Sequence, residues 1–248
     1  ATVNLTEWIE AVSELDTLVS MAQMRYDYPE AGSVTIIDKG KSKEPIYYEA
    51  KGLWHPFLGA GAVRNDFTIR DGNFYIVTGA NMAGKSTFLR ALGVNYILAM
   101  NGMPVFAESL TVSRFKLFSS MRTSDDLSHG ISYFNAELLR LQQLINYIQQ
   151  PTLLILDEIL KGTNSLDKLN GSRMFLRAIT DKPVSGVIAT HDLELAKMEQ
   201  ESPKFHNWCF EIALGTDVTY PYKITQGVAR NQNATYLLSR ILCNFAKK

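Results

Sequence analysis

One short stretch, from Gly79 to Thr87, constrains this chain more than any other feature of its sequence. It fits the pattern G-x-x-x-x-G-K-[ST], in which glycines let the backbone turn tightly and point successive N–H groups at a phosphate. A β-rich run at residues 74–77 enters the stretch, and residues 88–92 begin a helix whose N-terminal dipole favours anions. The stretch therefore predicts a phosphate-binding loop between a strand and a helix.

The residues of this loop have distinct predicted roles in binding ATP or ADP. Lys85 is expected to reach the β- and γ-phosphates, and the Ser86 hydroxyl to bind Mg²⁺. A nucleotide and Mg²⁺ are therefore the predicted cofactors. The alternative is an accidental glycine turn, which the flanking strand and helix disfavour. The predicted nucleotide contacts of the loop are Gly79, Ala80, Asn81, Met82, Ala83, Gly84, Lys85, Ser86 and Thr87.

A second motif lies at residues 153–158, where four apolar residues precede Asp157 and Glu158. Consecutive apolar residues predict a buried parallel strand, and ligands of open α/β sheets bind at the carboxyl ends of such strands. Asp157 is predicted to hold Mg²⁺, usually through water, and Glu158 to orient and deprotonate the attacking water. The alternative, two solvated acids at a strand end, is weaker once a phosphate-binding loop precedes them.

Weaker signals surround these two motifs. Residues 184–190 predict the next buried strand, and His191 follows it, where a histidine could sense the γ-phosphate. A histidine that merely satisfies its own hydrogen bonds is the alternative. The segment before the strand that enters the loop is expected to lie beside the adenine, with Val63 and Asn65 as candidate contacts.

Composition limits the functions open to this chain. Lys and Arg total 25 and so do Asp and Glu, so the formal net charge is zero, which disfavours a broad DNA-binding surface. The two cysteines, Cys209 and Cys243, lack metal-ligand spacing. No apolar run is long enough to span a bilayer, so no membrane contact and a cytoplasmic location are expected. Because the chain starts at Ala1, directly before a helical pattern, we expect a fragment of a longer protein.

The remaining patterns predict the order of elements. Expected helices cover residues 5–25, the stretch from 134 to Pro151, the stretch up to Ile179, and residues 234–245. Expected strands cover residues 34–37, 45–49, 205–214 and 219–225, with a strand pair at 110–121 and an irregular bridge at 52–67. Together they predict an α/β P-loop NTPase, similar to ABC ATPases, with a mainly parallel central sheet flanked by helices and an additional antiparallel part.

The joint set of motifs resembles one family, the C-terminal ATPase domain of MutS-type DNA mismatch repair proteins. Residues 78–87, TGANMAGKST, are similar to the family's TGPNMGGKST, and residues 189–191 to its ATH. Residues 157–167 resemble its DEIGRGT…D, and residues 125–137 its DD…G.STF..E signature. Tyr222 and Lys223 resemble a YK pair near the end of the domain. The resemblance covers nearly the whole chain, with residues 1–30 as the helical end of a preceding lever or core domain and 31–248 as the ATPase domain.

The resemblance implies properties that spacing alone does not give. Proteins of this family are ATPases that work as dimers with composite sites, so a homodimer is expected. Ser132 would reach, in trans, the γ-phosphate bound by the other subunit, and Asn81 would contact the γ-phosphate or the attacking water. Glu158 and His191 would complete the catalytic set. DNA would be bound by domains absent from this chain, and other repair proteins are expected partners.

Several positions depart from the family pattern, which favours a divergent MutS-like paralogue. Ala80 and Ala83 replace Pro and Gly in the loop, and Leu160 and Lys161 stand where Gly-Arg is usual. Ala62 occupies a position often filled by an aromatic residue that stacks on adenine. Relaxed base selectivity is therefore predicted.

Two other functions compete with a MutS-like ATPase. An ABC-type ATPase should carry an LSGGQ-like signature before the acidic strand, and this chain has none. A nucleotide-gated dimerisation module without hydrolysis is the second alternative. The presence of Lys85, Ser86, Asp157, Glu158 and His191 favours hydrolysis over that alternative.

Overall fold

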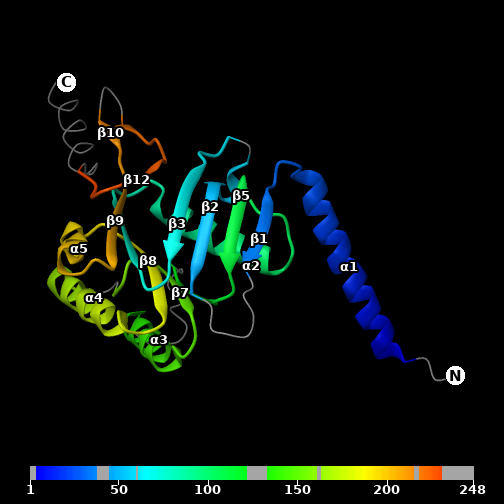
Figure 1. The fold of residues 1–248 in the computed structure, drawn as a ribbon, viewed down its shortest axis with the longest axis horizontal. Coiled ribbons are helices and arrows are strands. Elements are labelled where there is room, and N and C mark those ends of the chain that lie inside the picture. The colour runs from blue at the N-terminus through cyan, green and yellow to red at the C-terminus, as the bar shows by residue number, and fades with distance from the viewer. Residues whose placement is uncertain are drawn as a thin grey trace, which may run out of the picture.

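The computed structural model describes residues 4–37, 45–59, 61–121, 133–160, 163–214 and 218–230 (Figure 1). The fold is α/β, with two mixed β-sheets and helix α2 (Lys85–Met100) buried between them. The signature loop with Ser132 and the expected helix at 234–245 lie outside the described residues.

The larger sheet carries the motifs. Its strand order is β12-β9-β4-β8-β7-β6, and every pairing is parallel except that of β12 with β9. Three of these strands, β4, β7 and β8, are buried along their whole length, which explains their nearly continuous apolar sequences. The strand bounds are β4 (Phe74–Gly79), β6 (Lys116–Ser120), β7 (Thr152–Asp157), β8 (Val184–Thr190), β9 (Phe205–Phe210) and β12 (Ile224–Gln226).

Helices cover both faces of the larger sheet. Along β7, Ile155 packs in the cluster that contains α2, and Leu154 packs with the helices of the opposite face, because successive side chains of a strand point to opposite sides. Those helices gather beside β7 and β8 in Figure 1. They are α3 (Tyr133–Tyr147), α4 (Ser165–Ile179), a 3₁₀ turn (Leu193–Lys197) and α5 (Met198–Glu201).

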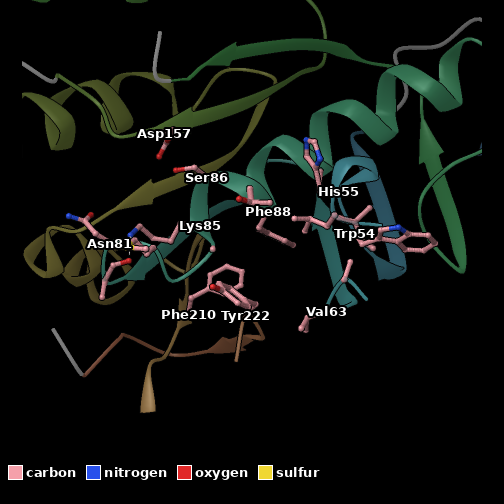
Figure 2. A pocket seen from close by; sticks show the side chains of 18 of the residues that line it. Trp54, His55, Val63, Asn81, Lys85, Ser86, Phe88, Asp157, Phe210 and Tyr222 are labelled. Carbon is pink, nitrogen blue, oxygen red and sulfur yellow. Dashed lines mark hydrogen bonds between the residues drawn. The ribbon is translucent and has the colours of Figure 1, made fainter. Parts of the chain in front are cut away.

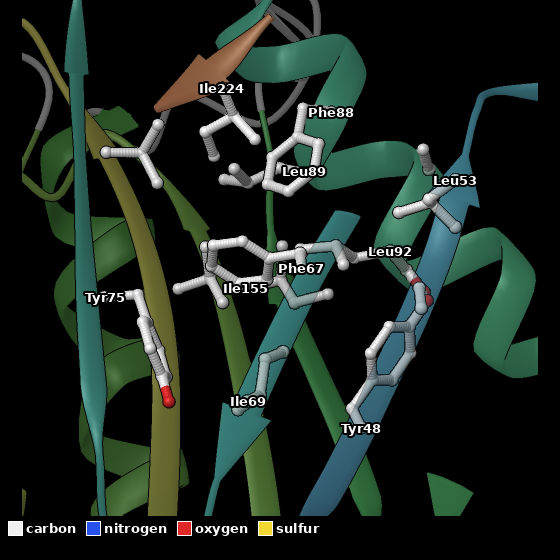
Figure 3. Close-up of a cluster of buried hydrophobic side chains, with 14 of the residues drawn as sticks. Tyr48, Leu53, Phe67, Ile69, Tyr75, Phe88, Leu89, Leu92, Ile155 and Ile224 are labelled. Atoms are coloured by element: carbon white, nitrogen blue, oxygen red, sulfur yellow. The ribbon is translucent and has the colours of Figure 1, made fainter. Parts of the chain in front are cut away.

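The smaller sheet closes the other side of α2. Its order is β1-β5-β2-β3, with β1 parallel to β5 and with β2 antiparallel to both of its neighbours. Figure 3 shows the side chains that fill the space around α2, among them Phe67, Leu92 and Ile155. The bounds are β1 (Ser33–Ile37), β2 (Tyr47–Leu53), β3 (Asn65–Arg70) and β5 (Ser109–Ser113), with a 3₁₀ turn (Pro56–Leu58) after β2 and a small pair, β10 (Ala213–Leu214) and β11 (Val218–Thr219).

The pairing expected between the two strands at residues 110–121 is wrong. Both strands form, but β5 joins the smaller sheet and β6 the larger one. Tyr96 of α2 holds the chain where it crosses between the sheets. Its hydroxyl donates to the Phe115 carbonyl at 2.7 Å and accepts from the Phe115 N–H at 2.9 Å, and the two rings stack at 4.0 Å.

The expected irregular bridge at residues 52–67 is also partly wrong, because it contains the end of β2 and the start of β3. In β3, Asn65, Phe67 and Ile69 are buried, and the residues between them are more exposed. This alternation is the period-two pattern of a half-buried strand.

The helix expected at residues 5–25 is confirmed as α1 (Leu5–Asp27), which extends away from the two sheets (Figure 1). None of its residues is buried, and most of its large apolar residues, among them Leu5, Trp8 and Val12, are more than half exposed. No helix in the described ranges is both long and apolar enough to cross a membrane. That α1 ends a preceding domain stays a prediction.

Candidate functional site

A cavity of about 630 Å³ lies where the carboxyl ends of β4 and β7 meet the start of α2 (Figure 2). Most of the predicted loop lines one end, together with both acids. Segments far away in the sequence line the other end. The lining residues are Leu53, Trp54, His55, Leu58, Gly61, Ala62, Val63, Ala80, Asn81, Met82, Gly84, Lys85, Ser86, Thr87, Phe88, Ala91, Asp157, Glu158, Phe210 and Tyr222.

The loop backbone needs both of its motif glycines. Gly79 has φ +152° and Gly84 has φ +110°, which L-residues rarely adopt. A Cβ on Gly79 would lie 2.8 Å from the carbonyl oxygen of Phe210, so no side chain fits there. Met82 is also left-handed, with φ +66°. The loop is thus a tight backbone turn that ends at the first residue of α2.

Lys85 is folded back onto its own loop. Its side chain is buried, and Nζ donates to the carbonyl oxygens of Gly79 at 2.6 Å and Ala80 at 2.9 Å. Burial lowers the pKa of Lys85, and the charges of Glu158 and Asp157 partly offset this by raising it. The ammonium group therefore stands in a desolvated position beside the loop, held by carbonyl oxygens that an anionic oxygen could replace.

Asp157 and Ser86 supply the oxygen donors of the site. Asp157 ends β7 and is buried, and its carboxylate and the Ser86 hydroxyl point toward each other in Figure 2. Carboxylate and hydroxyl oxygens suit Mg²⁺, which keeps several waters and needs few protein ligands. The described residues contain no group of three or more His, Cys, Asp or Glu that could hold a metal ion. The two donors therefore fit a Mg²⁺ that is shared with phosphates.

Glu158 is held by groups from two other elements. Its Oε1 lies 2.5 Å from Nδ1 of His191, which follows β8, and its Oε2 lies 3.5 Å from Nζ of Lys168 on α4. The Glu158 N–H also donates to the carbonyl of Ala189 at 2.9 Å. The structure thus brings Glu158 and His191 together at the ends of adjacent strands. Lys168 carries no motif signal, because only the docking of α4 places it beside Glu158.

The backbone after β7 adopts an unusual conformation. Glu158 has φ +63° and Leu160 has φ +56°, both in the left-handed region that favours glycine. The Leu160 N–H donates to Oε1 of Glu137 on α3 at 2.8 Å, and both of these residues are buried. This buried hydrogen bond anchors the turn that carries Glu158 to a neighbouring helix.

The two predicted adenine contacts differ in their placement. Val63 lines the cavity, whereas Asn65 does not. The Asn65 side chain instead donates to the carbonyl of Tyr222 at 3.0 Å and accepts from the N–H of Ile224 at 2.9 Å. Ala62 also lines the cavity, at the position where the family pattern often has an aromatic residue that stacks on adenine.

The lining residues that were not predicted as site residues include Trp54, His55, Phe210 and Tyr222. Tyr222 carried a usable signal, because it is the aromatic residue of the YK pair, but it lies far from the loop in sequence. Burial, followed by the nearby Arg90, lowers the pKa of His55. The end of the cavity opposite Asp157 and Glu158, where the sequence predicts the adenine and which we call the base end, is mostly aromatic and apolar.

A glycine-lysine-serine loop at the head of a buried helix, facing acids at the end of a parallel strand, is consistent with an α/β nucleotide-binding fold. The family model described as MutS domain V matches residues 75–238. The chain therefore belongs to the MutS family, as its motifs indicated.

Individual relatives agree with this family. The chain is 30% identical to the DNA mismatch repair protein MutS of Ruminiclostridium cellulolyticum over 230 residues, which are 88% of this chain and 26% of that protein. It is 31% identical to MutS of Chlorobaculum parvum over 229 residues, 89% of this chain and 26% of the relative. Human MutS protein homolog 4 is 27% identical over 241 residues, 92% and 25% of the two chains. The chain thus spans about a quarter of the length of these relatives.

Proposed function

We propose that this chain is the ATP-binding and ATP-hydrolysing module of a MutS-like DNA-processing protein. The observation that carries the proposal is the single cavity into which Lys85, Ser86, Asp157 and Glu158 converge. Membership of the MutS family, whose named relatives include DNA mismatch repair proteins, supports it independently.

The loop and Lys85 would bind the triphosphate. The backbone N–H groups of the loop and the start of α2 favour an anion, and the desolvated Lys85 ammonium adds a full charge. On binding, Lys85 would exchange the carbonyls of Gly79 and Ala80 for phosphate oxygens, since these two bonds now engage two of its three N–H groups. Asn81, in the same loop, would contact the γ-phosphate or the attacking water.

Ser86 and Asp157 would hold Mg²⁺. A bound Mg²⁺ would offset the negative charge that develops on the phosphates during hydrolysis. Glu158 would take a proton from the attacking water, because its carboxylate lines the same cavity. His191 would orient that carboxylate through the 2.5 Å contact of its Nδ1. At the other end, Val63 and the Tyr222 ring would flank the base, and Ala62 leaves room that permits relaxed base selectivity.

The natural unit is proposed to be a homodimer in which Ser132 completes the partner's site. DNA and other repair proteins would be bound by segments beyond this chain, since the relatives are about four times as long. Nucleotide turnover would then control how the dimer holds DNA.

The test is ATP turnover per chain, with Mg²⁺ and without DNA, across a range of protein concentrations. A rate per chain that rises with concentration and then saturates is expected from composite sites. ATP binding without turnover at any concentration would instead favour a nucleotide-gated dimerisation module. Neither binding nor turnover would contradict the proposal.

A further inference from the structure

Tyr222 is the aromatic residue of the base end whose position needs an explanation. It lies between β11 and β12, outside any strand, and its backbone is left-handed with φ +53°. Tyr222 is 45% exposed, and its ring stacks on that of Tyr220, with the ring centroids 6.0 Å apart. The Tyr222 ring stands over the loop, because a Cβ on Gly84 would lie 3.2 Å from Cδ1 of Tyr222 (Figure 2).

The backbone around Tyr222 is held by Asn65. This residue starts β3, is only 5% exposed and lies outside the cavity. Its amide nitrogen donates to the Tyr222 carbonyl at 3.0 Å, and its amide oxygen accepts from the Ile224 N–H at 2.9 Å. One buried side chain thus bonds to the backbone on both sides of residue 223. Lys223 adds a third hydrogen bond, which its Nζ donates to the Arg64 carbonyl at 2.5 Å.

We propose that Asn65 is a positioning residue for nucleotide specificity: it holds Tyr222 where the ring meets the base of a bound nucleoside triphosphate. The inference rests on the proposed ATP-binding function and deepens it. Both side-chain hydrogen bonds of Asn65 end on the 222–224 segment and not on the phosphate loop. Loss of the amide should therefore weaken contacts to the base and leave contacts to the phosphates intact.

The distinguishing measurement is the affinity for ATP and, separately, for inorganic triphosphate, both with Mg²⁺, by calorimetry. Asn65→Ala and Tyr222→Ala should each weaken ATP binding about tenfold, roughly the contribution of one well-placed contact, with triphosphate binding unchanged. The double variant should bind ATP no more weakly than Tyr222→Ala, because residues that act through one contact are not additive. Asn65→Ser, a milder change, serves if Asn65→Ala folds poorly.

Asn207→Ala is the matched control. Asn207 is also a buried amide, and its Nδ2 donates to the Ala196 carbonyl at 2.9 Å and to Glu199 at 2.7 Å, away from the cavity. Its loss should lower thermal stability without changing the ratio of ATP to triphosphate affinity. Equal weakening of ATP and triphosphate by Asn65→Ala, or additive losses in the double variant, would overturn the inference.

A second readout needs no nucleotide. With 3-fluorotyrosine at position 222, the fluorine resonance should sharpen and move toward its value in an unfolded peptide in Asn65→Ala, and not in Asn207→Ala. An unchanged resonance would overturn the positioning role of Asn65 even if the wild-type protein failed to bind ATP. That failure, or equal ATP affinity of wild type and Lys85→Ala, would instead overturn the proposed function, so the two ideas fail separately.

Discussion

The end of the cavity that we propose binds phosphates, the phosphate end, and the proposed base end are built in different ways. The phosphate end comes from one contiguous loop and from the carboxyl end of β7, and its key groups, Lys85 and Asp157, are buried. The base end is assembled from residues as distant in sequence as Val63 and Tyr222, which are both exposed. One end is thus a local backbone structure, and the other depends on tertiary contacts.

The difference indicates how each end should respond to substitution. A buried charge that is held by the loop backbone has no substitute nearby, so its loss should be severe. Exposed residues of the base end, such as Val63 and Tyr222, can be replaced with smaller changes in affinity. The following variants test this contrast in decreasing order of expected effect.

Replacing the carboxylate of Glu158 should have the largest effect. Glu158→Gln keeps the shape of the side chain but removes the base, so kcat for ATP hydrolysis should fall by about 10²- to 10⁴-fold. ATP affinity should change little. Steady-state turnover and calorimetry measure the two quantities, with Glu194→Gln, an exposed residue paired with Lys197, as the control. Turnover at the wild-type rate would remove Glu158 from the proposed role.

Lys85→Ala should abolish tight nucleotide binding. The loss should be about 100-fold, at the upper end for a hydrogen bond to a charged group. It should be equal for ATP and inorganic triphosphate, because Lys85 belongs to the phosphate end. Lys116→Ala, at an exposed position of β6, is the control. Unchanged calorimetric affinity would contradict the assignment of the loop.

Ala62→Phe should strengthen the binding of the base. A ring at this position would offer the base a stacking surface, which is worth about 1–3 kcal/mol per base, so ATP affinity should rise about tenfold. Triphosphate affinity should stay the same. Competition binding should also show that the wild type discriminates weakly between ATP and GTP and that the variant discriminates more strongly. A strong preference for ATP in the wild type would count against relaxed base selectivity.

Lys168→Met should give the smallest effect. The lysine lies 3.5 Å from Glu158 in a partly exposed ion pair, and such pairs contribute under about 1 kcal/mol. The expected result is a fall of about threefold in kcat with KM unchanged, and Lys168→Arg should restore most of the rate. Lys197→Met is the matched surface control. A changed KM with normal kcat would place Lys168 in binding instead.

The same contrast explains what the sequence could predict. The loop residues and the two acids were found because their pattern is contiguous, and the fold brings them to one cavity. Tyr222 was missed because nothing local connects it to the loop. Asn65 was predicted as a base contact from its position in the chain, but sequence position gives no direction for a side chain. Its amide in fact bonds to residues 157 and 159 positions away.

The errors in the fold have a similar cause. Residues 110–121 contain two strand patterns separated by a short turn, which is typical of a hairpin. Each strand instead pairs with a different sheet, and the chain between them contacts Tyr96 of α2 through Phe115, a tertiary contact that no local pattern reports. The start of β3 was interpreted as irregular, although polar and apolar residues alternate in its sequence from Asp66 to Arg70.

The left-handed backbone at Glu158 has an evolutionary consequence. A non-glycine residue held in this region costs about 1–3 kcal/mol, so glycine at position 158 would relieve strain. A lineage released from the need to hydrolyse ATP would therefore relieve this strain by mutating the residue that we propose takes the proton from water. Loss of the proposed activity would then come with a higher free energy of unfolding. Among diverged copies of this chain, the loss of that carboxylate should therefore be an early and repeated event.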